Sequence, residues 1–163
     1  MDFTRRAPYP RAPFVIDPDA PSAPVARLLA RGAAWLVLLG LLTGLYVAAA
    51  MTGKISADPH VALASHLSAL LGAFLLLGVA VTLPLLRYGP TGQRRLAWAF
   101  IVANFANWWV TGVKAALHVS GLEWTGQPAN DAVFVALTLA VVLPGLGGAA
   151  AWIFGLSGPV RRP

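Results

Sequence analysis

The chain has 163 residues, of which 58% are hydrophobic and only 11% charged, and its mean hydropathy is +0.70. So much apolar surface excludes a soluble domain of this size and predicts an integral membrane protein with little beyond a helical bundle. The absence of cysteine excludes disulfides, thiolate ligation of haem, iron–sulfur clusters and cysteine nucleophiles.

The N-terminal region, residues 1–31, is predicted to be a cytoplasmic tail. Residues 1–26 are rich in proline, alternate in charge and have no helical period, a pattern typical of a disordered or loosely adherent segment. A short basic tail, residues 158–163, ends the chain. The predicted membrane domain therefore covers residues 32–157.

Four apolar segments fill this domain, at about 32–51, 61–86, 96–119 and 132–156. Each can cross a bilayer as a helix, which takes roughly 20 residues. Because the connections are short, sequential helices are expected to be antiparallel neighbours. The predicted fold is all-α, a four-transmembrane-helix antiparallel bundle in which Pro84 and Pro144 bend the second and fourth helices.

Small residues recur at four-residue spacing in the first and fourth segments. Such stripes let helices approach closely in lipid, so we expect packing surfaces there, within or between subunits. The stripes are Gly32, Gly40, Gly44 and Ala48 in the first segment and Gly147, Ala151 and Gly155 in the fourth.

The basic residues indicate the orientation. Ten of the twelve Lys and Arg residues fall in the N-terminal region, the middle loop and the C-terminus, which share one side of the predicted bundle. Lys54 and Lys114 lie near the other side. Since Lys and Arg are enriched in cytoplasmic loops, both termini are predicted to be cytoplasmic in a multi-pass protein of the cell inner (cytoplasmic) membrane. The net charge of +6 thus reflects topology, and no nucleic-acid partner is expected.

The second segment carries no charge, but its first turns contain His66, flanked by Ser65 and Ser68. An ionisable side chain within a span costs about 2.5 kcal/mol or more, so such residues are usually functional. Neutral imidazole is also the commonest side-chain metal ligand. We therefore interpret His66 as a candidate axial ligand of a haem iron, the alternative being a histidine hydrogen-bonded to a neighbouring helix or lying at the headgroup level.

The third segment gathers its polar residues on one face. On a helical wheel, five side chains fall within about 80° of one another. They are Asn104, Asn107, Thr111, Lys114 and His118. In hydrocarbon such a face must contact protein, a cofactor or a cavity, and its role is either catalytic or structural. Lys114 can alternatively snorkel to the outer surface, and Trp108 and Trp109 can pack against lipid, a haem or an aromatic substrate.

Three stretches of the sequence stand in a recognisable order and spacing. They are LLGLLTGL in the first segment, DPHVALASHLSALLGAFLLLGV at the start of the second, and ANFANWW in the third. Together they resemble the hydroxylaminobenzene mutase and styrene oxide isomerase family of membrane isomerases, over about residues 33–156. The resemblance implies a trimer that holds haem b between subunits, with one histidine on the iron, and His66 matches that histidine.

The resemblance also implies a chemistry. Ferric haem acts as a Lewis acid that opens a small aromatic epoxide to an aldehyde, and the mutases convert an aryl hydroxylamine to an aminophenol. Asn107 matches an asparagine that orients the substrate or a ligand. Two positions depart from the pattern: Gly72 stands where relatives carry asparagine, and Thr111 where styrene oxide isomerase has tyrosine and the mutases look threonine-like.

From the polar face and the resemblance we select two sets of residues. The predicted catalytic residues are Asn104, Asn107 and Thr111. The predicted haem contacts are His66, Trp108 and Lys114, with His66 as the metal ligand.

Three functions follow from these patterns. The first is a haem-dependent isomerase or mutase that acts on a small aromatic substrate, in the bilayer and as a homo-oligomer. The second is an electron-transfer cytochrome with His66 and His118 as paired ligands, because both are predicted near the outer surface, His66 about 7 Å inside it. The third is a small structural or transport subunit without a cofactor, for which the glycine stripes and the Pro-rich tail suffice.

Overall fold

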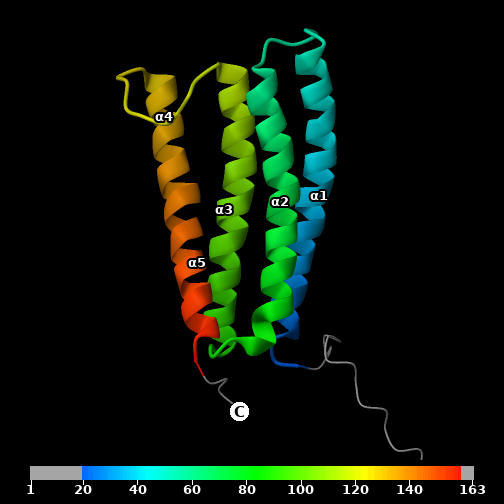
Figure 1. Cartoon of the computed structure of the whole chain (residues 1–163), viewed down its shortest axis with the longest axis vertical. Helices are drawn as coiled ribbons and strands as arrows, with labels where there is room; N and C mark the ends of the chain where they lie inside the picture. The colour runs from blue at the N-terminus through cyan, green and yellow to red at the C-terminus, as the bar shows by residue number, and fades with distance from the viewer. Residues whose placement is uncertain (1–19, 159–163) are drawn as a thin grey trace, which may run out of the picture.

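The computed structural model describes residues 20–158 and contains four membrane-length helical spans lying side by side (Figure 1). They are α1 (Ala23–Met51), α2 (Pro59–Thr82) with the short 3-10 turn η1 (Leu83–Leu85), α3 (Pro90–Leu117), and a last span built from α4 (Pro128–Leu137), η2 (Thr138–Val142) and α5 (Leu143–Leu156). The predicted all-α fold with four spans is confirmed. The predictions made for residues 1–19 and 159–163 lie outside the described residues.

Each span begins with a proline in its first turn: Pro24, Pro59, Pro90 and Pro128. Proline suits these positions because its fixed φ is already helical and its missing N–H would have no partner there. The first and third helices start at Ala23 and Pro90, well before the predicted residues 32 and 96. Hydropathy places a boundary where the apolar run begins, whereas a helix continues through a polar, arginine-bearing first turn.

The start of α2 is also fixed by a side chain. Asp58 accepts hydrogen bonds from the backbone N–H groups of His60 (2.9 Å) and Val61 (3.0 Å). The Val61 N–H is the main reason why the pKa of Asp58 lies below its ordinary value, helped by the His60 N–H and by the nearby His60 and His118 rings. The Asp58 N–H donates to the Ala115 carbonyl, so the first loop is docked on the end of α3.

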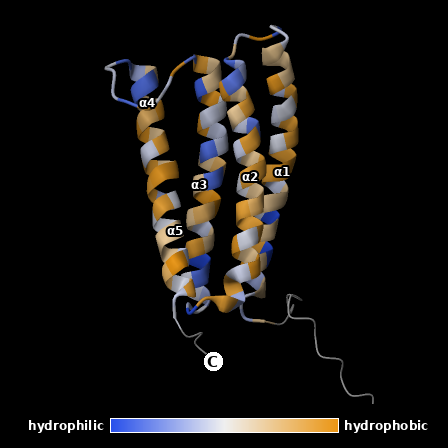
Figure 2. Cartoon of the chain, viewed as in Figure 1, coloured by the Kyte–Doolittle hydropathy of each residue, from blue (hydrophilic) through white to orange (hydrophobic). Residues whose placement is uncertain are grey.

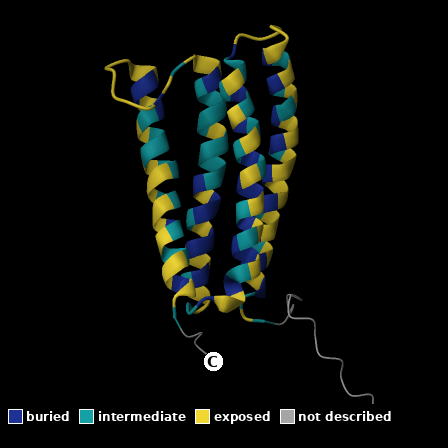
Figure 3. Cartoon of the chain, in the orientation of Figure 1, coloured by how far each residue is buried: buried dark blue, intermediate teal, exposed yellow. Residues whose placement is uncertain are grey.

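The core lies between α1, α2 and α3. Leu29, Leu36, Leu76 and Leu83 are fully buried there, and Phe100 packs beside them. Figure 3 shows buried residues concentrated on these three helices toward the end where η1 lies, while the last span is mostly exposed or half-buried. The exposed face of the bundle is largely apolar in every span, as expected for a surface in contact with lipid (Figure 2).

The last span packs on α3 and contains a π-helical turn in its middle. Pro144 follows this turn, and the Leu143 N–H donates to the Thr138 carbonyl five residues earlier. Because Pro144 has no N–H, a carbonyl one turn before it loses its helical partner, and the widened turn accommodates the defect. In α5, beyond this turn, the indole N–H of Trp152 donates to the Thr82 hydroxyl of α2 at 3.0 Å. Pro144 was predicted to bend this helix, and the structure has a π-helical turn directly before it.

The glycine stripe of α1 is an internal packing surface. A Cβ on Gly40 would meet Leu70 at 2.8 Å and one on Gly32 would meet Leu76 at 3.1 Å, so both glycines allow α2 to approach. The stripe of α5 is a packing surface only in part, because Gly155 lies against Tyr88 while Gly147 faces open space. The two described ends of the chain lie at the same end of the bundle (Figure 1).

Candidate active site

His66 points from α2 toward α1. Its Nδ1 atom lies 2.7 Å from the Gly40 carbonyl oxygen, and the ring is half-buried. A carbonyl only accepts hydrogen bonds, so Nδ1 carries the proton and donates it. The other ring nitrogen, Nε2, then has a free lone pair, which is the arrangement found in metal-ligating histidines.

Gly44 makes room for this ring. A Cβ at that position would lie 3.5 Å from His66 Cε1 and 3.7 Å from Nδ1. These are ordinary van der Waals distances, so a methyl group fits while a larger side chain would enter the space of the imidazole. The two glycines thus have separate tasks: Gly40 offers its carbonyl and Gly44 offers a flat surface beside the ring.

The other two described histidines lie at helix ends beside the loops, His60 in the first turn of α2 and His118 at the end of α3. His118 is the C-cap of α3, in the left-handed conformation (φ 52°), and its Nε2 atom is 3.2 Å from the Ser56 hydroxyl. It lies near Asp58, which precedes α2, whereas His66 is about 10 Å further along that helix by rise per residue. The expected similar depth of His66 and His118 is therefore not found, and one chain does not bring them together. His60 is exposed.

The polar face of α3 lies toward α2 and the last span. Phe100 and Ala103 face α5, because they lie beside Gly148 and Gly145. Asn107 is one turn beyond Ala103 and shares its side of the helix. Asn104 lies against Gly72 of α2, where a Cβ would meet its Oδ1 atom at 2.6 Å.

Three polar side chains of this face, Asn104, Asn107 and Thr111, have partners within α3. Asn104 donates to the Phe100 carbonyl at 2.8 Å, and Thr111 donates to Asn107 Oδ1 at 3.4 Å. Lys114 is half-buried. Within residues 20–158 no hydrogen bond joins this face to His66, which contacts α1 instead. The structure thus joins Asn107 to Thr111, places Asn104 against Gly72, and leaves His66 on a different side of α2.

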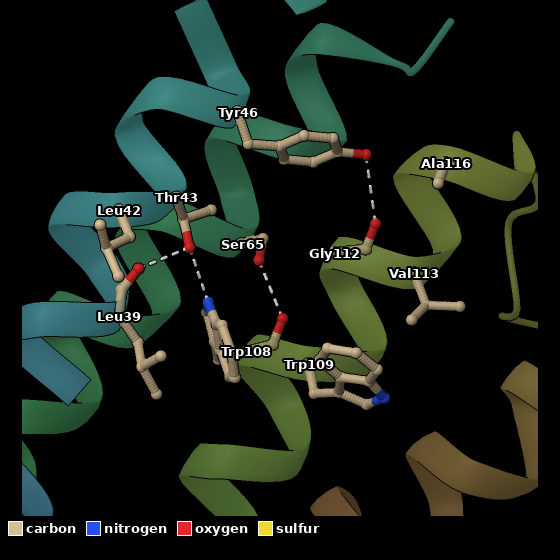
Figure 4. Close-up of a pocket in the computed structure, with 10 residues that line it drawn as sticks. All are labelled: Leu39, Leu42, Thr43, Tyr46, Ser65, Trp108, Trp109, Gly112, Val113 and Ala116. Carbon is tan, nitrogen blue, oxygen red and sulfur yellow. Dashed lines mark hydrogen bonds between the residues drawn. The ribbon is translucent and has the colours of Figure 1, made fainter. Parts of the chain in front are cut away.

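A cavity of about 490 Å³ opens between α1 and α3, with Ser65 of α2 at its base (Figure 4). Trp108 lines it, together with residues that the sequence analysis did not select: Leu39, Leu42, Thr43, Tyr46, Trp109, Gly112, Val113 and Ala116. Ser65 lines the cavity while the next residue, His66, lies against Gly40 and Gly44. The two features are therefore neighbours on α2 but face different directions.

Hydrogen bonds occupy the polar groups around this cavity. The Trp108 indole N–H donates to the Thr43 hydroxyl at 2.9 Å, and the Ser65 hydroxyl donates to the Trp108 carbonyl at 2.8 Å. The Tyr46 hydroxyl donates to the Gly112 carbonyl at 3.4 Å. What remains is a largely apolar chamber, of the kind that binds small molecules in proteins. Thr43, Tyr46 and Gly112 gave no sequence signal, because hydroxyls and glycines are common in spans and their partners are distant in the chain.

The comparison with known families bears on this arrangement. The model of the family described as styrene oxide isomerase matches residues 25–157, which include all four spans. The chain belongs to the styrene oxide isomerase family.

A curated relative agrees with this assignment. The hydroxylaminobenzene mutase HabB of Ectopseudomonas oleovorans is 33% identical over 150 residues, covering 86% of this chain and 87% of the relative. No solved structure matches the chain. Membership of the styrene oxide isomerase family and the mutase relative together identify the chain as a multi-pass membrane protein of the isomerase or mutase class.

Proposed function

We propose that this protein is a haem-dependent membrane mutase that rearranges a small aryl hydroxylamine to an aminophenol. The mutase relative and Thr111 favour this branch, and the family name favours a second candidate activity, the isomerisation of a small aromatic epoxide to an aldehyde. In the mutase reaction the oxygen moves from nitrogen to a ring carbon, and the proton displaced from that carbon is retained. Substrate and product therefore contain the same atoms, and no oxidant is needed.

The observation that carries the proposal is the hydrogen bond from His66 Nδ1 to Gly40. It fixes the tautomer that leaves Nε2 as a ligand. Within residues 20–158, no three His, Cys, Asp or Glu side chains gather to hold a bare metal ion. A porphyrin brings four nitrogens of its own and needs a single axial histidine, so the residues present fit a haem.

When bound, ferric haem supplies a Lewis acid for a substrate oxygen. The chain's own residues supply the rest. His66 holds the group and Gly40 orients His66. Leu41, Leu45 and Leu67, the sequence neighbours of Gly40, Gly44 and His66, are exposed apolar side chains that would keep water away from the group.

The polar face of α3 supplies orientation in this proposal. The Asn107 amide and the Thr111 hydroxyl, already joined to one another, offer one donor and one acceptor to a hydroxylamine or an epoxide. Asn104 stands beside them as part of the same predicted catalytic set. Trp108 and Lys114 remain predicted haem contacts, Trp108 through its aromatic surface and Lys114 as a cation for an anionic group.

The proposal includes a homo-oligomer, with a trimer as the expected form. His66 packs against α1, and the polar face of α3 lies on another side of α2. Copies arranged around an axis would bring the histidine of one chain next to α3 of the next, so that one site uses two subunits. The measurement is the mass of the detergent-purified particle, and a purely monomeric active protein contradicts this part.

The decisive experiment is purification in detergent after haem-sufficient expression, followed by incubation with phenylhydroxylamine and, separately, with styrene oxide. We expect a high-spin haem spectrum and an aminophenol product from phenylhydroxylamine. His66→Ala should lose the haem, and His60→Ala, at an exposed position in the first turn of α2, should keep it. A low-spin haem that is lost in His118→Ala would instead favour the paired-histidine cytochrome.

Gly44 offers a matched test of where the haem lies. Gly44→Ala adds a methyl at ordinary contact distance from the His66 ring and should keep the Soret band. Gly44→Leu fills the space of the ring and should reduce haem occupancy by about 10-fold or more, the usual cost of disturbing the support of a metal ligand. Equal haem content in the two variants would contradict His66 as the ligand.

A further inference from the structure

A basic hollow lies at the end of the bundle opposite His60 and His118. Its volume is about 550 Å³, and it is formed by the first turn of α1 and by α3. Arg27 and Arg31, one turn apart on α1, and Arg94 on α3 line it, together with Trp98. Three guanidinium groups from two helices therefore surround one concave surface.

Nothing acidic accompanies these arginines in the described part of the chain. The acidic residues between positions 20 and 158 are Asp58, Glu123 and Asp131, all in or beside the opposite loops. The N-terminus of α1 adds a partial positive charge, and its first turn contains no acidic residue. The N–H groups of Val25 and Ala26 already donate to the Ser22 carbonyl, so the helix contributes charge rather than free donors.

The hollow continues into an apolar surface. Arg31 also lines a second hollow of about 240 Å³ with Ala34, Trp35 and Leu38, further along α1. Trp35 is 57% exposed and Trp98 46%, so aromatic surface borders the arginines. A ligand that satisfies both regions must be anionic at one end and apolar at the other.

We propose that this hollow binds an anionic phospholipid of the surrounding leaflet. The phosphate of the headgroup lies among Arg27, Arg31 and Arg94, and an acyl chain runs along α1 over Trp35 and Leu38. Basic pockets between membrane helices are suited to such headgroups, and each Lys or Arg near the surface adds about 1 kcal/mol, or fivefold in binding. The site is independent of the haem proposal and of the cavity at Ser65.

The test is native mass spectrometry of the full-length protein after equilibration with an equimolar mixture of phosphatidylglycerol and phosphatidylcholine. We expect phosphatidylglycerol to be retained preferentially. Arg94→Gln should lower its retention about fivefold. Arg95→Gln is the matched control, because it removes the same charge from the next residue, which lines a different hollow. Arg27→Gln is the second variant, should Arg94→Gln fold poorly by circular dichroism.

Several outcomes would overturn the proposal. Equal retention of the two lipids, or an equal loss in Arg94→Gln and Arg95→Gln, would reduce the effect to general surface charge. Displacement of phosphatidylglycerol by inorganic phosphate would make this an ion site without lipid specificity. Retention that appears only in Asp17→Asn/Asp19→Asn would make the N-terminal segment the occupant.

Discussion

Single residues at the α2–α3 contact decide how the helices meet. Gly72 stands at a position where the resemblance implies asparagine in relatives. In this chain a side chain from the neighbouring helix fills the space that the smaller residue leaves. The Asn104 side chain fills the space beside Gly72, with its Oδ1 atom 2.6 Å from where a Cβ would be, so the amide at this contact comes from α3.

This contact predicts strong coupling between two positions. Gly72→Ala should lower the free energy of unfolding by about 1–3 kcal/mol, the usual cost of overpacking. Asn104→Ala removes the Oδ1 and Cγ atoms and leaves only the Cβ, 3.1 Å from the added methyl, so adding Gly72→Ala there should cost less. A double-mutant cycle in detergent measures the difference, and additive effects would contradict the contact. Gly78→Ala, in open space on the same helix, is the control.

At the scale of elements, α2 begins at a carboxylate cap. Because the Val61 and His60 N–H groups keep the pKa of Asp58 below its ordinary value, folding favours its ionised form. A lowered pKa contributes stability that is complete above the unfolded value and is lost as the pH falls through the folded value. The thermal midpoint of the protein should therefore decrease as the pH is lowered below about 4.

The matched variant is Asp58→Asn, which can still cap the helix but cannot titrate. Its thermal midpoint should depend less on pH in this acid range than that of the unchanged protein. Parallel melting curves recorded down to acid pH compare the two. Identical acid slopes would show that Asp58 makes no such contribution.

The π-helical turn of the last span is an insertion of one residue into a helix. Deleting Ala140 from η2 should convert it to α-helix while both α4 and α5 keep their faces toward α3. We expect this protein to be folded, with a thermal midpoint close to that of the full chain. Deleting Ala73 from the regular helix α2 is the control and should rotate every later residue by 100°, preventing folding. If neither deletion variant folds, the interpretation of η2 as a one-residue insertion is contradicted.

The elements show what sequence alone could predict. Hydropathy found all four spans, because lipid demands long apolar helices. It did not find the polar first turns, the π-helical turn or the separation of His66 from the α3 face. The helical wheel placed Asn107 and Thr111 on one face, where the structure joins them, but the direction of His66 depends on which side α1 approaches. The His66 ring is directed by Gly40 and Gly44. Their spacing in the sequence predicted a packing surface but could not show that α2 is the helix packed on it.

For the whole molecule, orientation in the membrane stays a prediction that the chain makes easy to test. The chain has no cysteine, so single cysteines introduced into it report only their own position. Ser157→Cys and Gly89→Cys lie at one end of the bundle, and Ser56→Cys and Ser120→Cys at the other. In intact cells an impermeant thiol reagent should label the second pair only. Labelling of the first pair would show that the orientation in the membrane is opposite to the prediction.

The prolines that open the four spans have a consequence for the bilayer itself. Spans of 27 to 29 residues are about 40 Å long, longer than a hydrocarbon layer of about 30 Å. Helix ends of ordinary composition can unwind to match a thinner membrane, whereas the N-terminal ends of these spans are fixed by pyrrolidine rings. Hydrophobic mismatch is then absorbed by tilting the bundle, by deforming the lipid or by the C-terminal turns. Membrane thickness should therefore change the inclination of this protein and leave the starting residue of each helix constant.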